Sequence, residues 1–262
     1  MAQYMADENH GVGIIITGGA KSRFKHPLLS EDEYINTIKD AAKAGYCILK
    51  NGGNAVEAVE KSVSVMENCE LFEAGRGSYV NASREVECDA IIMEGHTLDT
   101  GAVISGRYFK NPVCLSRNVL EETPHCALSG YGALDFAISI NFPCCEPNEL
   151  ITEDKMRKHI SHERFNDYVD FFYEGKPIPD WDNENSDNAD TACAVAIDKN
   201  GNLACATSKG GIAGKGKGRV GDAALVGCGG YANDKGEAAT TGHGEKLIKL
   251  TLARQVVIEM EN

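Results

Sequence analysis

The sequence has no apolar run as long as the roughly 20 residues that a membrane-spanning helix requires. Its first ten residues show neither the basic segment nor the apolar core of a secretory signal. Basic residues are also scarce, because 26 Lys and Arg stand against 39 Asp and Glu, a formal net charge of −13. This charge argues against nucleic acid or an anionic membrane as the main partner. Together these absences predict a globular protein of the cytoplasm.

Disulfide pairing is also not expected, although the chain has ten cysteines. None of them forms a CxxC pair, and Cys144 and Cys145 are adjacent. Without a secretory signal, such cysteines are typical of reduced, small buried residues rather than of a disulfide framework.

The first 145 residues alternate between apolar strands and helices with clear start signals. Apolar residues make up 42% of the chain, which is enough for a sizeable core. Ser30 with Glu33, and Asn54 with Glu57, have the spacing of a capping box and predict the starts of two helices. Strands are expected at residues 11–17, 86–93, 100–106 and 125–129, and further helices at 112–121, 131–140 and from about 245.

The composition changes between residues 146 and 190, where 13 acidic residues stand against five basic ones. A segment with so little to bury cannot offset the entropy of ordering it, so we expect an acidic mobile linker here. The linker divides the chain into an N-terminal portion, residues 1–190, and a C-terminal portion, residues 191–262, of one structural domain.

The apolar pattern returns abruptly at Thr191. Two apolar runs, 191–197 and 203–207, flank a DKNGN turn and predict a β-hairpin. A threonine hydroxyl is a weak nucleophile unless a base takes its proton. If the bond between Asp190 and Thr191 were cut, the new α-amine, with a pKa of roughly 7.7–8.0, would be that base. For the pattern alone, a threonine that only begins a strand is the commoner case.

Several sequence blocks in a fixed order favour the nucleophile. The chain resembles the plant-type L-asparaginase and isoaspartyl peptidase family of N-terminal nucleophile hydrolases, whose relatives include glycosylasparaginase and taspase. The blocks that carry this resemblance are GNAVEAVE (53–60), AGRGSYVN (74–81), ECDAIIMEG (87–95), TGAV (100–103), DTACAVAID (190–198), GRVGD (218–222), GCGGYA (227–232) and TTGHGE (240–245).

The resemblance implies an α+β fold, a four-layer αββα sandwich, here lacking the C-terminal strands of the family. It implies a precursor that cuts itself between Asp190 and Thr191, with Thr191 then attacking the side-chain amide of L-asparagine or the isopeptide bond of a β-aspartyl dipeptide. It further implies that no cofactor is required and that two αβ units pair into a homodimer.

Five more site residues follow from the matched motifs. By resemblance, Arg219 should pair with the substrate α-carboxylate, a role that suits its planar guanidinium, and Asp222 should hold the α-ammonium. Thr241 and the Gly242 N–H should form the oxyanion hole. Gly244 should line the substrate pocket.

Other patterns in these blocks suggest different sites. Residues 216–221 satisfy GxGxxG and residues 211–217 nearly satisfy a P-loop, but neither is expected to open a helix inside a βαβ unit. Arg219 and Asp222 could instead form an exposed ion pair. His243 has no Ser or Cys partner for a triad, so packing is its expected role. Structural roles are also expected of His125, Cys126, Thr207 and Ser208.

Several residues depart from the family pattern, among them Thr17 in place of the usual His, and two of them could modulate the site. Lys209 stands where relatives have a Thr or Ser that helps to orient the nucleophile, and Glu73 stands where they have Asn. The loop around Glu73, residues 69–78, is where the resemblance implies a structural sodium ion held by backbone oxygens. These departures keep two alternatives open: a catalytically impaired paralogue, and a hydrolase closer to glycosylasparaginase or taspase.

Overall fold

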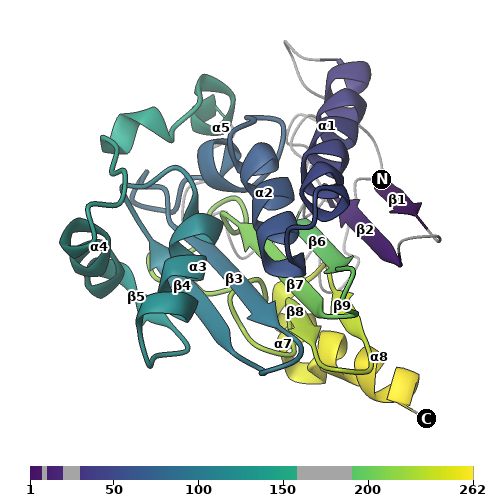
Figure 1. The fold of residues 1–262 in the computed structure, drawn as a ribbon. Helices are drawn as coiled ribbons and strands as arrows, with labels where there is room; N and C mark the ends of the chain where they lie inside the picture. The colour runs from purple at the N-terminus through teal and green to yellow at the C-terminus, as the bar shows by residue number, and fades with distance from the viewer. Residues whose placement is uncertain (8–10, 20–29, 158–190, 262) are drawn as a thin grey trace.

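A computed structural model describes residues 1–7, 11–19, 30–157 and 191–261 of the protein. Within these residues, seven strands form one sheet in the order β1-β2-β6-β7-β3-β4-β5 (Figure 1). All neighbours are antiparallel except β4 and β5. The strands are β1 Ala2–Asp7, β2 Val12–Thr17, β3 Cys88–Glu94, β4 Thr100–Gly106, β5 Leu128–Ser129, β6 Ala192–Ile197 and β7 Leu203–Lys209.

Helices α1 Glu31–Lys50, α2 Ala55–Glu67 and α3 Pro112–Glu122 cover one face of this sheet (Figure 1). Both predicted capping boxes are present, at the starts of α1 and α2. The helices can lie close to the central strands because the residues that β6 and β7 turn toward them are small. The buried core here includes Ile14, Ile16, Ile38, Val59, Val63, Met66, Ala192, Ala194, Ala196, Ala204 and Ala206.

A short hairpin and two helices pack on the opposite face. Strands β8 Gly230–Ala232 and β9 Glu237–Ala239 pair with each other and contact β7, and α8 Leu252–Glu261 contacts both of them. Helix α7 Gly244–Leu250 precedes α8. The single final helix expected from about residue 245 is therefore two helices, because Thr251 has a left-handed φ of 46° and interrupts it.

The segment between β4 and the hairpin of β6 and β7 differs in part from its sequence prediction. The strand expected at 125–129 is only β5, and His125 and Cys126 lie exposed before it. Helix α4 Gly130–Ser139 forms as expected. Within the predicted acidic linker, the 3₁₀ helix Pro147–Glu149 and α5 Glu153–Arg157 surround the buried Leu150. The rest of the linker, residues 158–190, lies outside the described residues.

None of the helices in the described ranges is both long enough and apolar enough to cross a membrane.

Candidate active site

Thr191 lies immediately before β6, a central strand of the sheet. The residue is fully buried, and no described residue forms a hydrogen bond with its hydroxyl. Its backbone nitrogen donates to Thr241 Oγ1 at 3.3 Å, across 50 residues of sequence. A buried hydroxyl left without a partner is uncommon in proteins and often marks a functional site. Asp190, the other side of the expected cut, is outside the described residues.

Thr241 and Gly242 occupy the turn between β9 and α7, so the expected oxyanion hole lies beside Thr191. Gly242 has a φ of 148°, a backbone conformation that side chains with a Cβ rarely adopt. A Cβ added at Gly242 would meet nothing closer than Leu247 Cδ1, at 3.9 Å. Glycine is therefore required here by the backbone conformation and not by a lack of space.

Three expected substrate-binding residues converge at one point. A Cβ added to Gly244 would lie 2.9 Å from Arg219 Nη2 and 3.0 Å from Asp222 Oδ1. Both carboxylate oxygens of Asp222 are buried, and neither accepts a hydrogen bond from another residue of the described chain. Burial raises the pKa of Asp222, and the Lys209 charge acts in the opposite direction. A buried, unsatisfied carboxylate next to a guanidinium is suited to bind a group that carries both charges.

Arg219 is held in place by Glu245 of α7. Its Nε and Nη2 donate to the two Glu245 oxygens at 2.9 and 2.8 Å. This side-on pair leaves the Nη1 and Nη2 edge of the guanidinium for another carboxylate. The Arg219 side chain is 13% exposed. The alternative of an exposed Arg219–Asp222 pair is therefore wrong, because Arg219 is shielded and its ion-pair partner is Glu245.

Two acids of the β3 region support this site, and the sequence analysis did not single them out. Asp89 accepts hydrogen bonds from the backbone N–H groups of Ser105 and Gly221, at 2.8 and 3.1 Å. Glu87 accepts from the Gly218 N–H and forms a buried ion pair with Arg107. These bonds fix both ends of the turn that carries Arg219. The sequence feature that could have identified them is the spacing of Glu87 and Asp89, two positions apart at the start of an apolar strand, which places both side chains on the same face.

The rejected motifs have structural roles. No helix begins between residues 210 and 243, so neither the GxGxxG pattern nor the near P-loop opens one. His243 is the N-cap of α7, with Nδ1 accepting from the Lys246 N–H at 3.1 Å, and burial lowers its pKa. Thr207 donates to the Ala223 carbonyl at 2.5 Å. Ser208 points to the other face of the sheet, beside Glu67.

Lys209 and Glu73, which depart from the family pattern, are both buried. Lys209 is 3% exposed and ends β7, directly opposite Asp89 of β3. Glu73 is buried with the Lys155 ammonium 4.0 Å from its Oε1, and that ammonium lies 4.0 Å above the Tyr79 ring. The Glu73 carbonyl accepts a hydrogen bond from the N–H of Gly210, which follows Lys209. The loop around Glu73 thus positions the end of β7.

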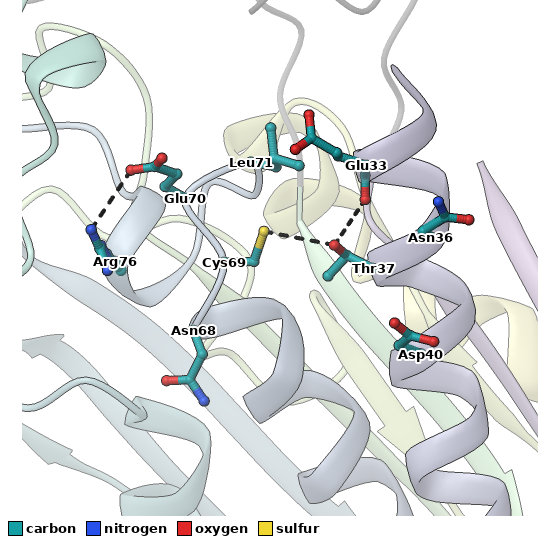
Figure 2. Close-up of a pocket in the computed structure, with 9 residues that line it drawn as sticks. All are labelled: Glu33, Asn36, Thr37, Asp40, Asn68, Cys69, Glu70, Leu71 and Arg76. Carbon is teal, nitrogen blue, oxygen red and sulfur yellow. Dashed lines mark hydrogen bonds and ion pairs between the residues drawn. The ribbon is translucent and has the colours of Figure 1, made fainter. Parts of the chain in front are cut away.

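A cavity of about 460 Å³ lies between α1 and the loop after α2. Figure 2 shows Thr37 next to Cys69 across it, and an ion pair of Glu70 with Arg76 at its rim. None of the predicted catalytic or substrate-binding residues lines this cavity, whereas Cys69, Glu70, Leu71 and Arg76 of the loop 69–78 do. The described ranges contain no cluster of His, Cys, Asp or Glu side chains able to hold a metal ion.

Comparison with known proteins adds independent evidence. A family model described as asparaginase matches residues 10–262. The chain is 42% identical over 251 residues to an isoaspartyl peptidase/L-asparaginase of Danio rerio, covering 95% of this chain and 76% of that protein. Proteins of the same description from Rattus norvegicus and Homo sapiens are each 43% identical, over 95% and 84% of this chain and 71% and 68% of theirs. These findings confirm the resemblance drawn from the sequence blocks.

Proposed function

The chain belongs to the asparaginase family, and from that premise we propose that it is a self-cleaving threonine hydrolase of L-asparagine and β-aspartyl dipeptides. One observation carries this proposal. A buried Thr191 hydroxyl, to which no described residue forms a hydrogen bond, lies beside Thr241 at the head of a central strand. Relatives described as isoaspartyl peptidase/L-asparaginase support hydrolysis of both kinds of bond, and no finding gives the impaired paralogue better support.

Cleavage between Asp190 and Thr191 would complete the catalytic group. It releases the Thr191 α-amine, which is partly neutral near its ordinary pKa of about 8 and can take the proton of the adjacent hydroxyl. The nucleophile and its base then belong to one residue. Thr241 Oγ1, which already accepts from the Thr191 nitrogen, would keep the amine oriented.

Substrate binding would use Arg219 and Asp222, which lie next to each other at Gly244. The free edge of Arg219 would hold the α-carboxylate in a bidentate pair, and Asp222 would take the α-ammonium. Fixing both charges of the head group places the side-chain carbonyl at a set distance from Thr191. Small residues at 221 and 244 keep the approach open, since a Cβ at either would lie 2.9 Å from an Arg219 nitrogen.

The reaction then takes two steps. Thr191 Oγ1 attacks the amide carbonyl, and the Thr241 hydroxyl and Gly242 N–H stabilise the resulting oxyanion. The carbon–nitrogen bond breaks, and ammonia or an amino acid leaves with the proton held by the Thr191 amine. Water, deprotonated by the same amine, hydrolyses the ester and releases aspartate.

Finer features of the fold belong to this proposal. We propose that the β8–β9 hairpin is part of the second sheet of a four-layer αββα sandwich, supported by its contacts with β3, β6 and β7 on the face opposite α1 and α2. Residues 1–190 and 191–262 would be the two subunits of one cleaved domain. Two such αβ units would form a homodimer, which light scattering of the purified protein would measure.

The sodium ion expected near residues 69–78 also remains a proposal, with no other cofactor required. Backbone carbonyls and the buried Glu73 carboxylate are the hard oxygen ligands that such a cation prefers. A higher melting temperature in sodium chloride than in choline chloride of equal ionic strength would support it. Equal melting temperatures would contradict it.

Turnover provides the test of the proposed function. We expect the purified protein to release ammonia from L-asparagine and aspartate from a β-aspartyl dipeptide, and the Thr191→Ala variant to release neither. The matched control is Thr240→Ala, because Thr240 neighbours the site and its hydroxyl donates to the backbone carbonyls of Cys228 and Gly229. Activity that survives in Thr191→Ala would contradict the assignment.

A further inference from the structure

Three residues on neighbouring strands form one row beside the substrate site. The register pairs Asp89 of β3 with Lys209 of β7, and Ala192 of β6 with Ser208 of β7. Extending this antiparallel register by one residue, from Ala192 and Ser208, places Thr191 opposite Lys209. Directly opposed residues point to the same face of a sheet with Cβ atoms about 4.5–5.5 Å apart. Lys209 therefore lies between the nucleophile and a buried acid, on the face that carries Asp222.

The charge of Lys209 acts on Asp222 rather than on Asp89. Both Asp89 oxygens are occupied by backbone N–H groups. Among the charges that lower the pKa of Asp222 against burial, Lys209 has the largest effect, ahead of Arg219. Burial raises the pKa of the Cys193 thiol, two residues after Thr191. The Asp222 charge raises this pKa further, and the Lys209 charge acts in the opposite direction. None of the ion pairs in the described chain joins Lys209 to Asp222 within 4 Å, so Lys209 acts on it through space.

The position of Lys209 changes which substrates Arg219 and Asp222 can bind. An α-ammonium seated at Asp222 would share that carboxylate with the buried Lys209 ammonium, and like charges at such a position repel. A substrate without an α-amino group avoids this repulsion, while its carboxylate still meets Arg219. Lys209 is 3% exposed, so little solvent screens the interaction.

We propose that Lys209 determines substrate preference, shifting the site from α-amino substrates toward ω-monoamides of dicarboxylic acids that lack the α-amine, such as succinamate. The inference rests on the proposed function, because it uses the same nucleophile and the same Arg219 contact. The reaction balances in the same way: Thr191 Oγ1 bonds to the amide carbon, ammonia leaves, and water hydrolyses the ester to succinate.

The test compares kcat/KM for succinamate and L-asparagine in four proteins. Lys209→Met keeps a long apolar stem and removes the charge, and we expect it to raise the asparagine-to-succinamate ratio about 10- to 100-fold, chiefly through the KM of asparagine. Lys209→Arg retains a charge and should keep the ratio of the unmodified protein. Lys217→Met is the matched control, since Lys217 is an exposed lysine that pairs with Glu85. An unchanged ratio in Lys209→Met, or an equal change in Lys217→Met, would overturn the inference.

A binding measurement separates this inference from the proposed function. The products, succinate and L-aspartate, are titrated into the same four proteins by calorimetry, which requires no turnover. We expect Lys209→Met to gain affinity for aspartate relative to succinate by the same factor. Equal relative affinities in Lys209→Met and the unmodified protein overturn the role of Lys209. Failure to hydrolyse either amide, with the affinity shift present, overturns only the proposed function.

Discussion

On the face of the sheet that α1 and α2 cover, strands β6 and β7 present Ala192, Ala194 and Ala206, which pack in one apolar core. On the opposite face, Lys209 ends the same β7 and Thr191 precedes the same β6. The first face buries methyl groups against helices. The second buries a lysine and a hydroxyl that bonds to no described residue, and the lysine charge acts on the buried carboxylate of Asp222.

The period-two alternation of a strand produces this difference, because successive side chains point to opposite faces. A shift of register by one residue would move Thr191 into the helix-covered core and Ala192 into the site. The helix-covered core thus fixes the register that presents the nucleophile. We therefore expect mutations on the polar face to change kinetics with little loss of stability, and mutations on the apolar face to do the reverse.

The largest expected effect is that of Arg219→Met. The substitution removes the bidentate partner of the substrate α-carboxylate, an interaction worth about 2–5 kcal/mol. We expect kcat/KM for L-asparagine to fall by about 30- to 4,000-fold, while the melting temperature changes little. Arg254→Met, in the exposed part of α8, is the control and should keep its kcat/KM. Equal losses in both variants would remove Arg219 from the binding site.

Thr241→Val should act on the chemical step. It preserves the shape of the side chain but removes the hydroxyl that we place in the oxyanion hole, so kcat should fall by about 10²- to 10³-fold. Thr240→Val is the neighbouring control, because the Thr240 hydroxyl bonds to backbone carbonyls, that of Cys228 at 2.6 Å and that of Gly229 at 3.5 Å. That variant should lose stability and keep its kcat. A larger kcat loss in Thr240→Val than in Thr241→Val would contradict the assignment.

Ile38→Ala probes the apolar face. Ile38 is fully buried between α1 and the sheet core, so the substitution leaves a cavity and should lower the free energy of unfolding by about 2–5 kcal/mol. Urea denaturation measures this loss, and KM for asparagine should stay unchanged. Ile138→Ala removes an isoleucine that is 59% exposed and should change stability by less than about 0.5 kcal/mol. A raised KM in Ile38→Ala would show that the faces are not independent.

The smallest effect, counted per pH unit, concerns the pH dependence of stability. Burial raises the pKa of Glu67 to about 8 from an ordinary 4.5. Between these two pH values, the folded state therefore keeps a proton that the unfolded state loses. The contribution of this proton to the free energy of unfolding is fully present below about pH 4.5 and is lost as the pH rises through about 8. Glu67→Gln should reduce the fall in stability across this range by at most about 1.4 kcal/mol per pH unit. Glu31→Gln, at an exposed position of α1, is the control, and equal slopes in all three proteins would contradict the prediction.

Local signals in the sequence predicted the elements they govern. The capping boxes at Ser30 and Asn54 marked α1 and α2 correctly because a cap is a contact within four residues. β1 was missed, since its exposed edge position leaves no clear alternation in AQYMAD. The break at Thr251 was also missed, because no glycine marks the left-handed residue.

The residues of the candidate site also divide into those that the sequence identified and those that it did not. Resemblance identified Thr191 and Thr241, and the structure brings them into contact. Sequence reasoning missed Glu87, Asp89 and Glu245, because each acts on a loop or side chain more than 15 residues away. Partners at such distances are set by tertiary packing, and no local spacing encodes them.

Intact-mass spectrometry of the purified protein under denaturing conditions is the most direct measurement of the central claim. We predict two polypeptides whose masses sum to that of the whole chain plus one water, the smaller comprising residues 191–262 with Thr191 at its N-terminus. The Thr191→Ala variant should remain one chain. A single uncut mass for the unmodified protein after long incubation would contradict the account.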